Sequence, residues 1–290
     1  MPADILCIGS VLWDVIGRTP SHMRMGSDVP GRIVRIPGGV ALNIAMTLRR
    51  FGMAPALLSA VGRDPAGEEL VARCEELGLD CAHLYRSADL PTDVYMAVEA
   101  ANGLVAAIAD AHSLEAAGRR ILAPLLDGAL SGWSGPVALD GNLTESLLAG
   151  IAASELAACA DLRVAPASPG KAERLTPFLR GAGTLYVNLE EACLLAKSDP
   201  RGAAEGAEAL LARGAVRVLV TDGGRVAADG SLEGIVEAQP PEVMVTRVTG
   251  AGDTFMAAHI AAESGGADRL EALERALSAA AAYVSGEAPL

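Results

Sequence analysis

The sequence lacks several features that would point to other classes of protein. Lys and Arg number 23 against 36 Asp and Glu, which gives a formal net charge of −13. Nucleic-acid binding needs clustered positive charge, so this balance argues against it, although one anionic ligand can still be held by a local site. Charges interrupt every apolar stretch before the roughly 18–20 residues that a bilayer span requires. We therefore expect neither nucleic acid nor a membrane as a partner.

Paired cysteines, metal-ligand histidines and a targeting signal are also missing. The five cysteines are scattered and include no Cys-x-x-Cys pair, which is typical of reduced, mostly buried thiols. The four histidines show no metal-ligand spacing. The N-terminus has no basic segment, and Asp14 interrupts its apolar run. Together these absences predict a cytoplasmic protein.

The common nucleotide-binding and hydrolase motifs do not occur. The sequence contains no Gly-x-x-x-x-Gly-Lys-[Ser/Thr] and no Gly-x-Gly-x-x-Gly after an expected strand. Neither a Gly-x-Ser-x-Gly elbow nor the motif set of protein kinases is present. A P-loop, a dinucleotide-binding fold and those two enzyme classes are therefore not supported.

A turn of small residues, Gly250–Gly252, stands directly before an expected helix. A bulky anion can approach its backbone N–H groups closely, and the N-terminus of a helix favours negative charge. Asp253 follows in the first turn of the helix. A phosphoryl group gathers negative charge during transfer while the acceptor hydroxyl loses a proton. An anion hole made by Gly250, Ala251 and Gly252 beside a carboxylate meets both needs. The alternative is that Asp253 only stabilises the helix dipole.

A second helix led by glycine begins after Gly38 and Gly39, with Asn43 one turn in. The Asn43 amide can both donate to and accept from a sugar hydroxyl, or it can simply lie on the helix surface. Asp14 falls in an otherwise apolar run shortly after the first expected strand. Its carboxylate can bind two hydroxyls, or it can face solvent from a strand.

Three further polar sites follow expected strands. Asn188 and Glu191 open a helix with the spacing of a capping box. Their functional interpretation is that they hold hydrated Mg²⁺ against nucleotide phosphates. Thr221 and Gly223 can contact phosphate or form a tight turn, and Lys171 is either a phosphate ligand or a surface lysine.

The order of strand and helix patterns predicts the architecture. Repeated strand–helix units, including helices over Leu114–Leu126 and Thr144–Cys159, indicate an α/β fold with a mostly parallel sheet covered by helices. Ligands bind such sheets at the carboxyl ends of the strands. Short β-type runs from about 11–37 and 83–110, with an Asn102-Gly103 hairpin signal, predict a small separate sheet. We expect a single domain over residues 1–290.

Taken together, these residues resemble the ribokinase-like (PfkB-type) carbohydrate kinases. Thr249-Gly-Ala-Gly-Asp253 matches the C-terminal signature of that family, and Gly38 through Asn43 matches the N-terminal one. The resemblance implies a three-layer ribokinase-like fold with a mostly parallel central sheet, covering helices and a small β-sheet lid. It also implies an ATP-dependent phosphotransferase that uses Mg²⁺ and acts on a hydroxymethyl group of a sugar or nucleoside.

The resemblance assigns roles to individual residues. Asp253 would be the catalytic base, and Gly250, Ala251 and Gly252 the anion hole. The residues expected to bind substrate are Asp14, Gly38, Gly39, Asn43, Thr92 and Asp110. Those expected to bind ATP are Lys171, Asn188, Thr221 and Gly223, with Glu191 holding Mg²⁺ through water. Many relatives dimerise through their lids, so a homodimer is expected.

Within the family, local strings are similar to those of pseudouridine kinases: Val29–Ile33 leading into Gly38–Ala45, Val105–Asp110 and Pro166–Lys171. We therefore expect pseudouridine as acceptor. Its ribose hydroxyls would meet Asp14 and Asn43, and its base edge would meet lid residues at Thr92, Asp93, Tyr95 and Asp110. The alternatives are a kinase for a plain sugar, such as ribose, fructose or 2-keto-3-deoxygluconate, or a sensor without turnover.

Two residues depart from the pattern of the relatives. Leu42 stands where pseudouridine kinases often carry arginine, which bears on the exact substrate. Arg247 replaces the Asp or Asn that is common just before the C-terminal signature. That change bears on a site for a monovalent cation such as K⁺, which some relatives have beside the anion hole.

Overall fold

A large, mostly parallel sheet forms the centre of the body of the molecule. The computed structural model describes residues 2–101, 103–126, 128–181 and 183–287. In these residues eight strands form the sheet in the order β14-β13-β12-β11-β10-β9-β1-β4, and only β13 and β14 run antiparallel to their neighbours. The strands are β1 (Ile5–Ile8), β4 (Pro55–Leu58), β9 (Pro136–Asp140), β10 (Asp161–Ala165), β11 (Thr184–Asn188), β12 (Arg217–Thr221), β13 (Ala227–Ser231) and β14 (Gly234–Ala238).

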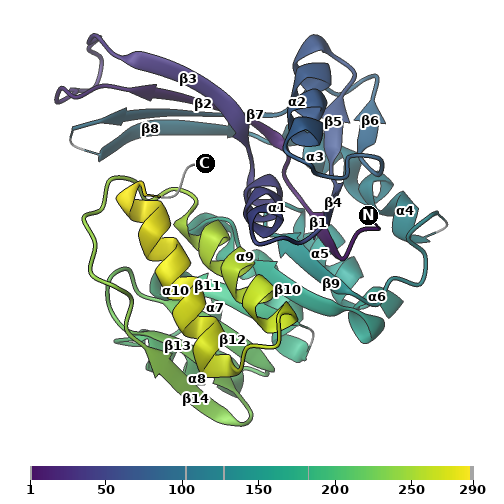
Figure 1. Cartoon of the computed structure of the whole chain (residues 1–290), viewed down its shortest axis with the longest axis vertical. Coiled ribbons are helices and arrows are strands. Elements are labelled where there is room, and N and C mark those ends of the chain that lie inside the picture. The colour runs from purple at the N-terminus through teal and green to yellow at the C-terminus, as the bar shows by residue number, and fades with distance from the viewer. Residues whose placement is uncertain (1, 102, 127, 182, 288–290) are drawn as a thin grey trace.

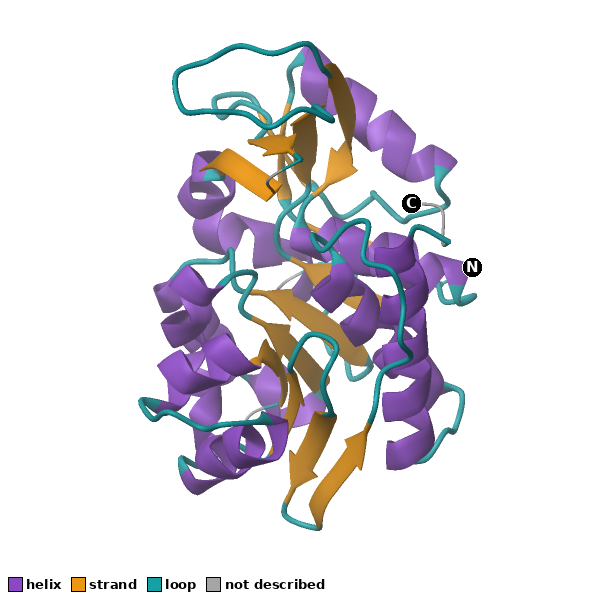
Figure 2. Cartoon of the chain, turned by 90° about the vertical axis from the view of Figure 1, so that its left-hand side faces the viewer, coloured by secondary structure: helices purple, strands orange, loops and turns teal. Residues whose placement is uncertain are grey.

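Helices cover both faces of this sheet, as Figure 2 shows. Successive side chains of a strand point to opposite faces. In β1, Ile5 and Cys7 accordingly pack with helices α1 (Val40–Arg50), α9 (Ala251–Ser264) and α10 (Arg269–Ser285). Leu6 and Ile8 pack on the other face, with the helices α5 (Glu145–Ala152), η2 (Pro169–Arg180), α7 (Leu189–Ala196) and α8 (Ala203–Ala212). The expected three-layer α/β fold is therefore confirmed.

Two helices expected to be continuous are broken. The first consists of α3 (His112–Ala117), the 3₁₀ turn η1 (Gly118–Leu122) and α4 (Ala123–Leu126), because Gly118 has a φ of 52° that no helix continues through. The second consists of two helices: α5 ends at Ala152, and α6 (Glu155–Cys159) begins after Ser154. Lys171 lies inside η2, which is a 3₁₀ helix.

A four-stranded sheet stands apart from the body as a lid (Figure 1). Its order is β3-β2-β7-β8, and only β2 and β7 run parallel to each other. The strands are β2 (Leu12–Arg18), β3 (Arg32–Gly38), β7 (Val94–Ala100) and β8 (Gly103–Asp110). The hairpin from β7 to β8 was expected at Asn102-Gly103. Gly103 has a φ of 94°, and Asn102 lies outside the described residues.

The run expected at residues 83–86 does not belong to the lid. Its strand, β6 (Tyr85–Ser87), pairs in parallel with β5 (Ala60–Gly62) in a separate two-stranded sheet. The helix α2 (Pro65–Glu76) connects the two strands, and a crossover helix of this kind makes parallel partners of the strands it joins.

The cysteines are all free, but fewer are buried than expected. Cys7 and Cys74 are buried, Cys81 and Cys193 are half-buried, and Cys159 is exposed. Helices in the described parts of the chain are too short or too polar to cross a membrane.

Candidate active site

The small-residue turn leads into α9, with Gly250 as its N-cap residue and Ala251 as its first residue. Gly250 has a φ of 90°, and a Cβ there would lie 2.5 Å from the Tyr283 hydroxyl oxygen, so only glycine fits. A Cβ at Gly252 would meet no atom within 4 Å. The backbone on that side therefore faces open space. Because the first N–H groups of a helix lack intrahelical acceptors, an anion can approach them here.

Asp253 lies in the first turn of α9, and its carboxylate accepts a hydrogen bond from Nδ2 of Asn43 at 2.9 Å. Asn43 belongs to α1, which packs beside α9 (Figure 1). Burial raises the pKa of Asp253 to about 7, against the opposing effect of the Asn43 hydrogen bond. The charges of Asp140, Asp14 and Glu191 raise this pKa further. A carboxyl group titrating near neutral pH suits proton exchange with a hydroxyl.

Gly38 and Gly39 connect β3 to α1 and lie against atoms of the protein itself. A Cβ at Gly38 would be 2.1 Å from Oδ2 of Asp14. At Gly39, where φ is 99°, a Cβ would be 2.5 Å from the Ser10 carbonyl oxygen. Packing alone thus requires both glycines, and it holds Asp14 of β2 beside the N-terminus of α1. Burial raises the pKa of Asp14 to about 6.

The sequence patterns did not single out a polar network at the carboxyl ends of β1 and β9. Asp140 is fully buried and accepts hydrogen bonds from the backbone N–H of Ser10 at 2.7 Å and from its hydroxyl at 2.5 Å. Asn142 donates through Nδ2 to Oγ of Ser10 at 3.1 Å, and Nζ of Lys171 donates to Oδ1 of Asn142. One signal was available, because Asp140 ends a buried strand and Asn142 comes two residues later, at the ligand-binding edge of the sheet.

The residues expected to bind ATP lie along this same edge. Thr221 ends β12 and is the register partner of Asn188 at the end of β11. Gly223 has a φ of 59°, and a Cβ there would meet no atom within 4 Å. Lys171 is half-buried, so its interpretation as an ordinary surface lysine is not supported. Burial is also the main cause that lowers its pKa.

Asn188 and Glu191 form the predicted capping box at the start of α7. Oδ1 of Asn188 accepts from the backbone N–H of Glu191, and Oε2 of Glu191 accepts from that of Asn188, each at 2.9 Å. Glu191 is only 7% exposed, and burial raises its pKa to about 7. In the described part of the chain, His, Cys, Asp and Glu do not gather in threes as a metal site. One carboxylate suits Mg²⁺, which keeps most of its water and binds phosphate oxygens.

Thr92 and Asp93 make their hydrogen bonds to other parts of the protein. The backbone N–H and the hydroxyl of Thr92 both donate to Asp64, the N-cap residue of α2, at 2.7 Å each. Asp93 accepts from the backbone N–H groups of Ser113 and Leu114 at 2.9 and 3.0 Å. Both side chains are buried. The expectation that Thr92 binds substrate is therefore not supported, because its donors already have partners.

Asp110 lies on the wrong face of the lid. It is the register partner of Val94, whereas the next residue, Tyr95, is the partner of Asp14. Directly opposite residues share a face of a sheet, and consecutive residues lie on opposite faces. Asp110 is therefore on the face away from Asp14, where its carboxylate contacts Nδ1 of His112 at 2.7 Å. This corrects the expectation that Asp110 binds substrate.

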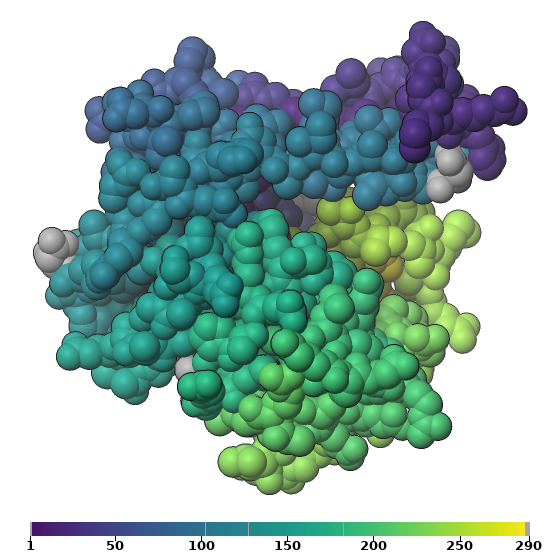
Figure 3. Space-filling view, turned by 180° about the vertical axis from the view of Figure 1, so that it is seen from behind, coloured from purple at the N-terminus to yellow at the C-terminus, as the bar shows by residue number. Residues whose placement is uncertain are grey.

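Arg247 places a positive charge beside the anion-hole turn. Its guanidinium lies over the ring of Tyr283 at 3.9 Å, and its Nε donates to the Tyr283 carbonyl oxygen at 2.7 Å. The body and the lid are separated by a hollow on the face shown in Figure 3. The site therefore consists of the N-termini of α1 and α9 in the body and the Asp14 face of the lid.

Comparison with known proteins places this arrangement in context. The sequence pattern of the pfkB family carbohydrate kinases matches residues 2–289. A pseudouridine kinase of Escherichia coli (strain K12) is 29% identical over 262 residues, which cover 87% of this chain and 81% of that protein. Fructoselysine 6-kinase of Shigella flexneri is 25% identical, with 84% and 88% covered. A carbohydrate kinase structure from Agrobacterium tumefaciens is similar with a TM-score of 0.81 and 26% identity, covering 96% of this chain and 90% of that one.

Proposed function

The chain belongs to the pfkB family of carbohydrate kinases, and we propose that the acceptor of this ATP-dependent kinase is pseudouridine, phosphorylated at its 5′-hydroxyl. The observation that carries the phosphoryl-transfer chemistry is the position of Asp253. Its carboxylate has a pKa raised by burial to about 7 and lies at a helix N-terminus where Gly252 leaves the backbone open. A binding protein without turnover has no use for a base beside an anion site.

The residues divide the chemistry among them. Asp253 takes the proton of the acceptor hydroxyl, whose oxygen then bonds to the γ-phosphorus of ATP as the bond to the leaving ADP breaks. Asn43 fixes the carboxylate through its hydrogen bond. The backbone of Gly250–Gly252 receives the negative charge that gathers on the transferred group. Lys171 adds a positive charge at the nucleotide edge.

Magnesium fits one end of this site. Glu191, with Asn188, would hold hydrated Mg²⁺, which neutralises phosphate charge when bound. Thr221 and Gly223 extend the same edge toward the nucleotide. A monovalent cation is not part of the proposal, because the Arg247 guanidinium already supplies positive charge beside the turn.

Two observations support a nucleoside acceptor. The pseudouridine kinase relative is similar over most of both chains, at higher identity than the fructoselysine kinase. Asp14, held beside Gly38, is placed to accept from ribose hydroxyls. Leu42 is fully buried, so it does not contact the acceptor. Any contact that arginine makes at this position in relatives is therefore absent here.

We also propose that the protein is a cytoplasmic homodimer joined through its lids. The lid face away from Asp14 carries the exposed apolar side chains of Ile33, Met96 and Ile108, which are 77%, 48% and 66% exposed. Exposed apolar side chains on one face of a sheet are typical of an interface. Free cysteines, including exposed Cys159, suit a reducing compartment.

Initial rates with a set of acceptors test the assignment. We expect the kcat/KM of pseudouridine to exceed those of uridine, adenosine, ribose, fructose and 2-keto-3-deoxygluconate under identical ATP and Mg²⁺ concentrations. The product should carry its phosphate on the 5′-oxygen, which phosphorus NMR can establish. A plain sugar with a higher kcat/KM than pseudouridine would overturn the acceptor and leave the kinase activity standing.

A further inference from the structure

The lid face that carries Asp14 has a charged row farther out, which the proposed function has not used. Alternate residues of a strand share a face, so Asp14, Ile16 and Arg18 of β2 lie in line on it. Arg32 of β3 and Glu99 of β7 are the register partners of Arg18 and complete the outer row. Two residues of strand separate successive rows by roughly 6.6 Å.

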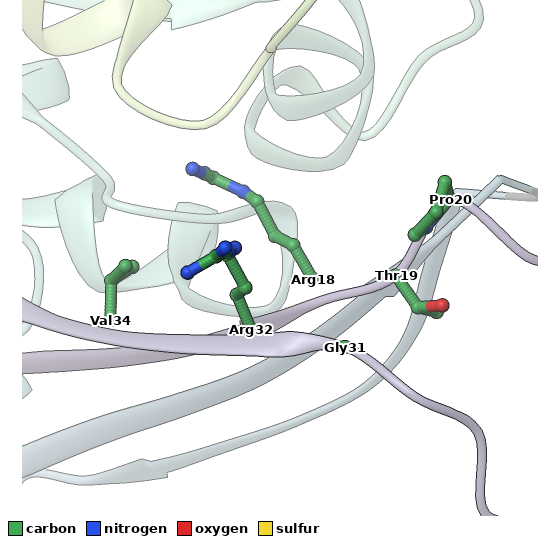
Figure 4. A pocket seen from close by; sticks show the side chains of 6 residues that line it. All are labelled: Arg18, Thr19, Pro20, Gly31, Arg32 and Val34. Atoms are coloured by element: carbon green, nitrogen blue, oxygen red, sulfur yellow. The ribbon is translucent and has the colours of Figure 1, made fainter.

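The middle row is apolar. Ile16 has Val34 and Ala97 as its register partners. The face therefore changes along β2 from a carboxylate at Asp14, through an apolar floor, to the charged outer row. Figure 4 shows Arg18, Arg32 and Val34 projecting from the same side of the strands.

This face looks across to the catalytic end of the body. Burial raises the pKa of the Tyr283 hydroxyl, which donates to the Thr249 carbonyl oxygen in the anion-hole turn. The charges of Asp253 and Arg18 both act on the same hydroxyl. Asp253 raises this pKa and Arg18 lowers it, so Arg18 of the lid lies on the side of the lid that faces the body.

The outer row has an excess of hydrogen-bond donors. Nε of Arg18 lies 2.6 Å from Oε2 of Glu99, and both side chains are partly exposed. Arg32 is exposed and has no ion-pair partner among the residues that the structure describes. Like charges directly opposite each other destabilise a sheet, so placing Arg32 against Arg18 costs stability. A pocket of about 450 Å³ lies at this pair, lined also by Thr19 and Val34.

The row combines guanidinium donors with one carboxylate acceptor. Guanidinium groups bind carbonyl oxygens of bases, and carboxylates accept from base N–H groups. The uracil ring of pseudouridine presents both kinds of atom on the edge away from the ribose. In the apolar row Ile16 and Ala97 are buried and Val34 is 40% exposed. A nucleoside with its hydroxyls at Asp14 would therefore lay its ring against Val34 and turn that edge outward. A plain sugar would fill only the first row.

We propose that Arg18, Arg32 and Glu99 bind the carbonyl and N–H edge of the acceptor base and so determine the preference for a nucleoside. This inference rests on the proposed function, since it names the residues that distinguish pseudouridine from ribose at the same site. It also replaces Thr92 and Asp110, which the structure places elsewhere.

Two variants with a matched control test the proposal. Arg32→Gln and Glu99→Gln remove one charge each from exposed or partly exposed positions. The ratio of kcat/KM for pseudouridine to that for ribose should fall at least about tenfold in each, because each variant removes a hydrogen bond that the base makes and ribose alone cannot make. The loss should appear in KM for pseudouridine, with kcat within about twofold. Arg24→Gln, in the exposed turn between β2 and β3, should keep the ratio of the wild type.

The possible failures are distinct. If the wild type prefers pseudouridine and both variants keep that preference within about twofold, the outer row does not bind the base and this inference is overturned alone. If the wild type prefers ribose or another plain sugar, the proposed acceptor is overturned, and the inference with it. Melting temperatures of all three variants verify that the lid remains folded.

Discussion

At the scale of single residues, the proton affinity of Asp253 decides whether the proposed chemistry is right. Asp253→Asn keeps the shape of the side chain but cannot accept the proton, so kcat should fall by about 10²–10⁴-fold. Binding of ATP, measured by calorimetry, should persist. Near-normal turnover at saturating acceptor would show instead that Asp253 serves only the helix terminus.

The pKa of about 7 also predicts a pH dependence with a definite sign. A general base works when ionised, so kcat/KM for the acceptor should decline as the pH drops below about 7. The stability of the folded protein should change with pH in the opposite direction. A carboxyl whose folded pKa is raised favours the folded state when protonated, and stability is lost as pH rises from about 4 to 7. Asp253→Asn should therefore melt above the wild type at pH 8, with a smaller difference at pH 5. A constant difference across this range would contradict the assigned pKa.

The sequence could identify residues whose role follows from local pattern. Asp253, Asn43 and Asp14 were found because glycines or apolar neighbours mark their positions, and the structure brings all three together. Thr92 and Asp110 were misjudged, because the face of a strand and the partners of a hydroxyl depend on register with distant segments. The same holds for the outer row of Arg18, Arg32 and Glu99, which exists only through strand pairing.

At the scale of elements, the start of α7 serves both folding and the proposed metal site. Glutamine can replace glutamate in a capping box, so Glu191→Gln should fold with a melting temperature near that of the wild type. Hydrated Mg²⁺ depends on the carboxylate charge. The Mg²⁺ concentration for half-maximal rate should therefore rise, and kcat should fall.

The exposed neighbour Glu190 provides the matched control for this metal experiment. Glu190→Gln removes one charge from the same helical turn without touching the box, so its Mg²⁺ titration should match the wild type. Superimposable titrations of Glu191→Gln and Glu190→Gln would leave Glu191 with a capping role alone.

The elements themselves were predictable where apolar periodicity is strong. The starts of α1 and α9 follow from their glycine turns, and most strands of the body from short buried runs. The breaks at Gly118 and Ser154 were not expected, because alanine-rich stretches read as continuous helix on both sides. The pairing of β6 with β5 required knowing that α2 crosses between them.

At the scale of the whole molecule, the exposed apolar side chains on the lid face away from Asp14 predict a dimer. Ile108→Lys puts a charge on that face, in the edge strand β8, and should convert the protein to a monomer by sedimentation velocity. Leu232→Lys, in the hairpin turn between β13 and β14 and 88% exposed, is the control and should leave the assembly unchanged. A wild-type protein that sediments as a monomer at micromolar concentration would refute the lid interface.

One junction links the motion of the lid to the base. β3 ends at Gly38 and α1 begins at Val40, so a single residue separates a lid strand from the helix that carries Asn43. This connection is too short to flex independently. The backbone N–H of Asn43 also donates a hydrogen bond to the Gly39 carbonyl oxygen at 2.8 Å. A movement of β3 would consequently move the first turn of α1 as well. We therefore expect a lid movement on acceptor binding to reach, through Gly39, the Asn43 amide that hydrogen-bonds Asp253, and so to change the proton affinity of Asp253.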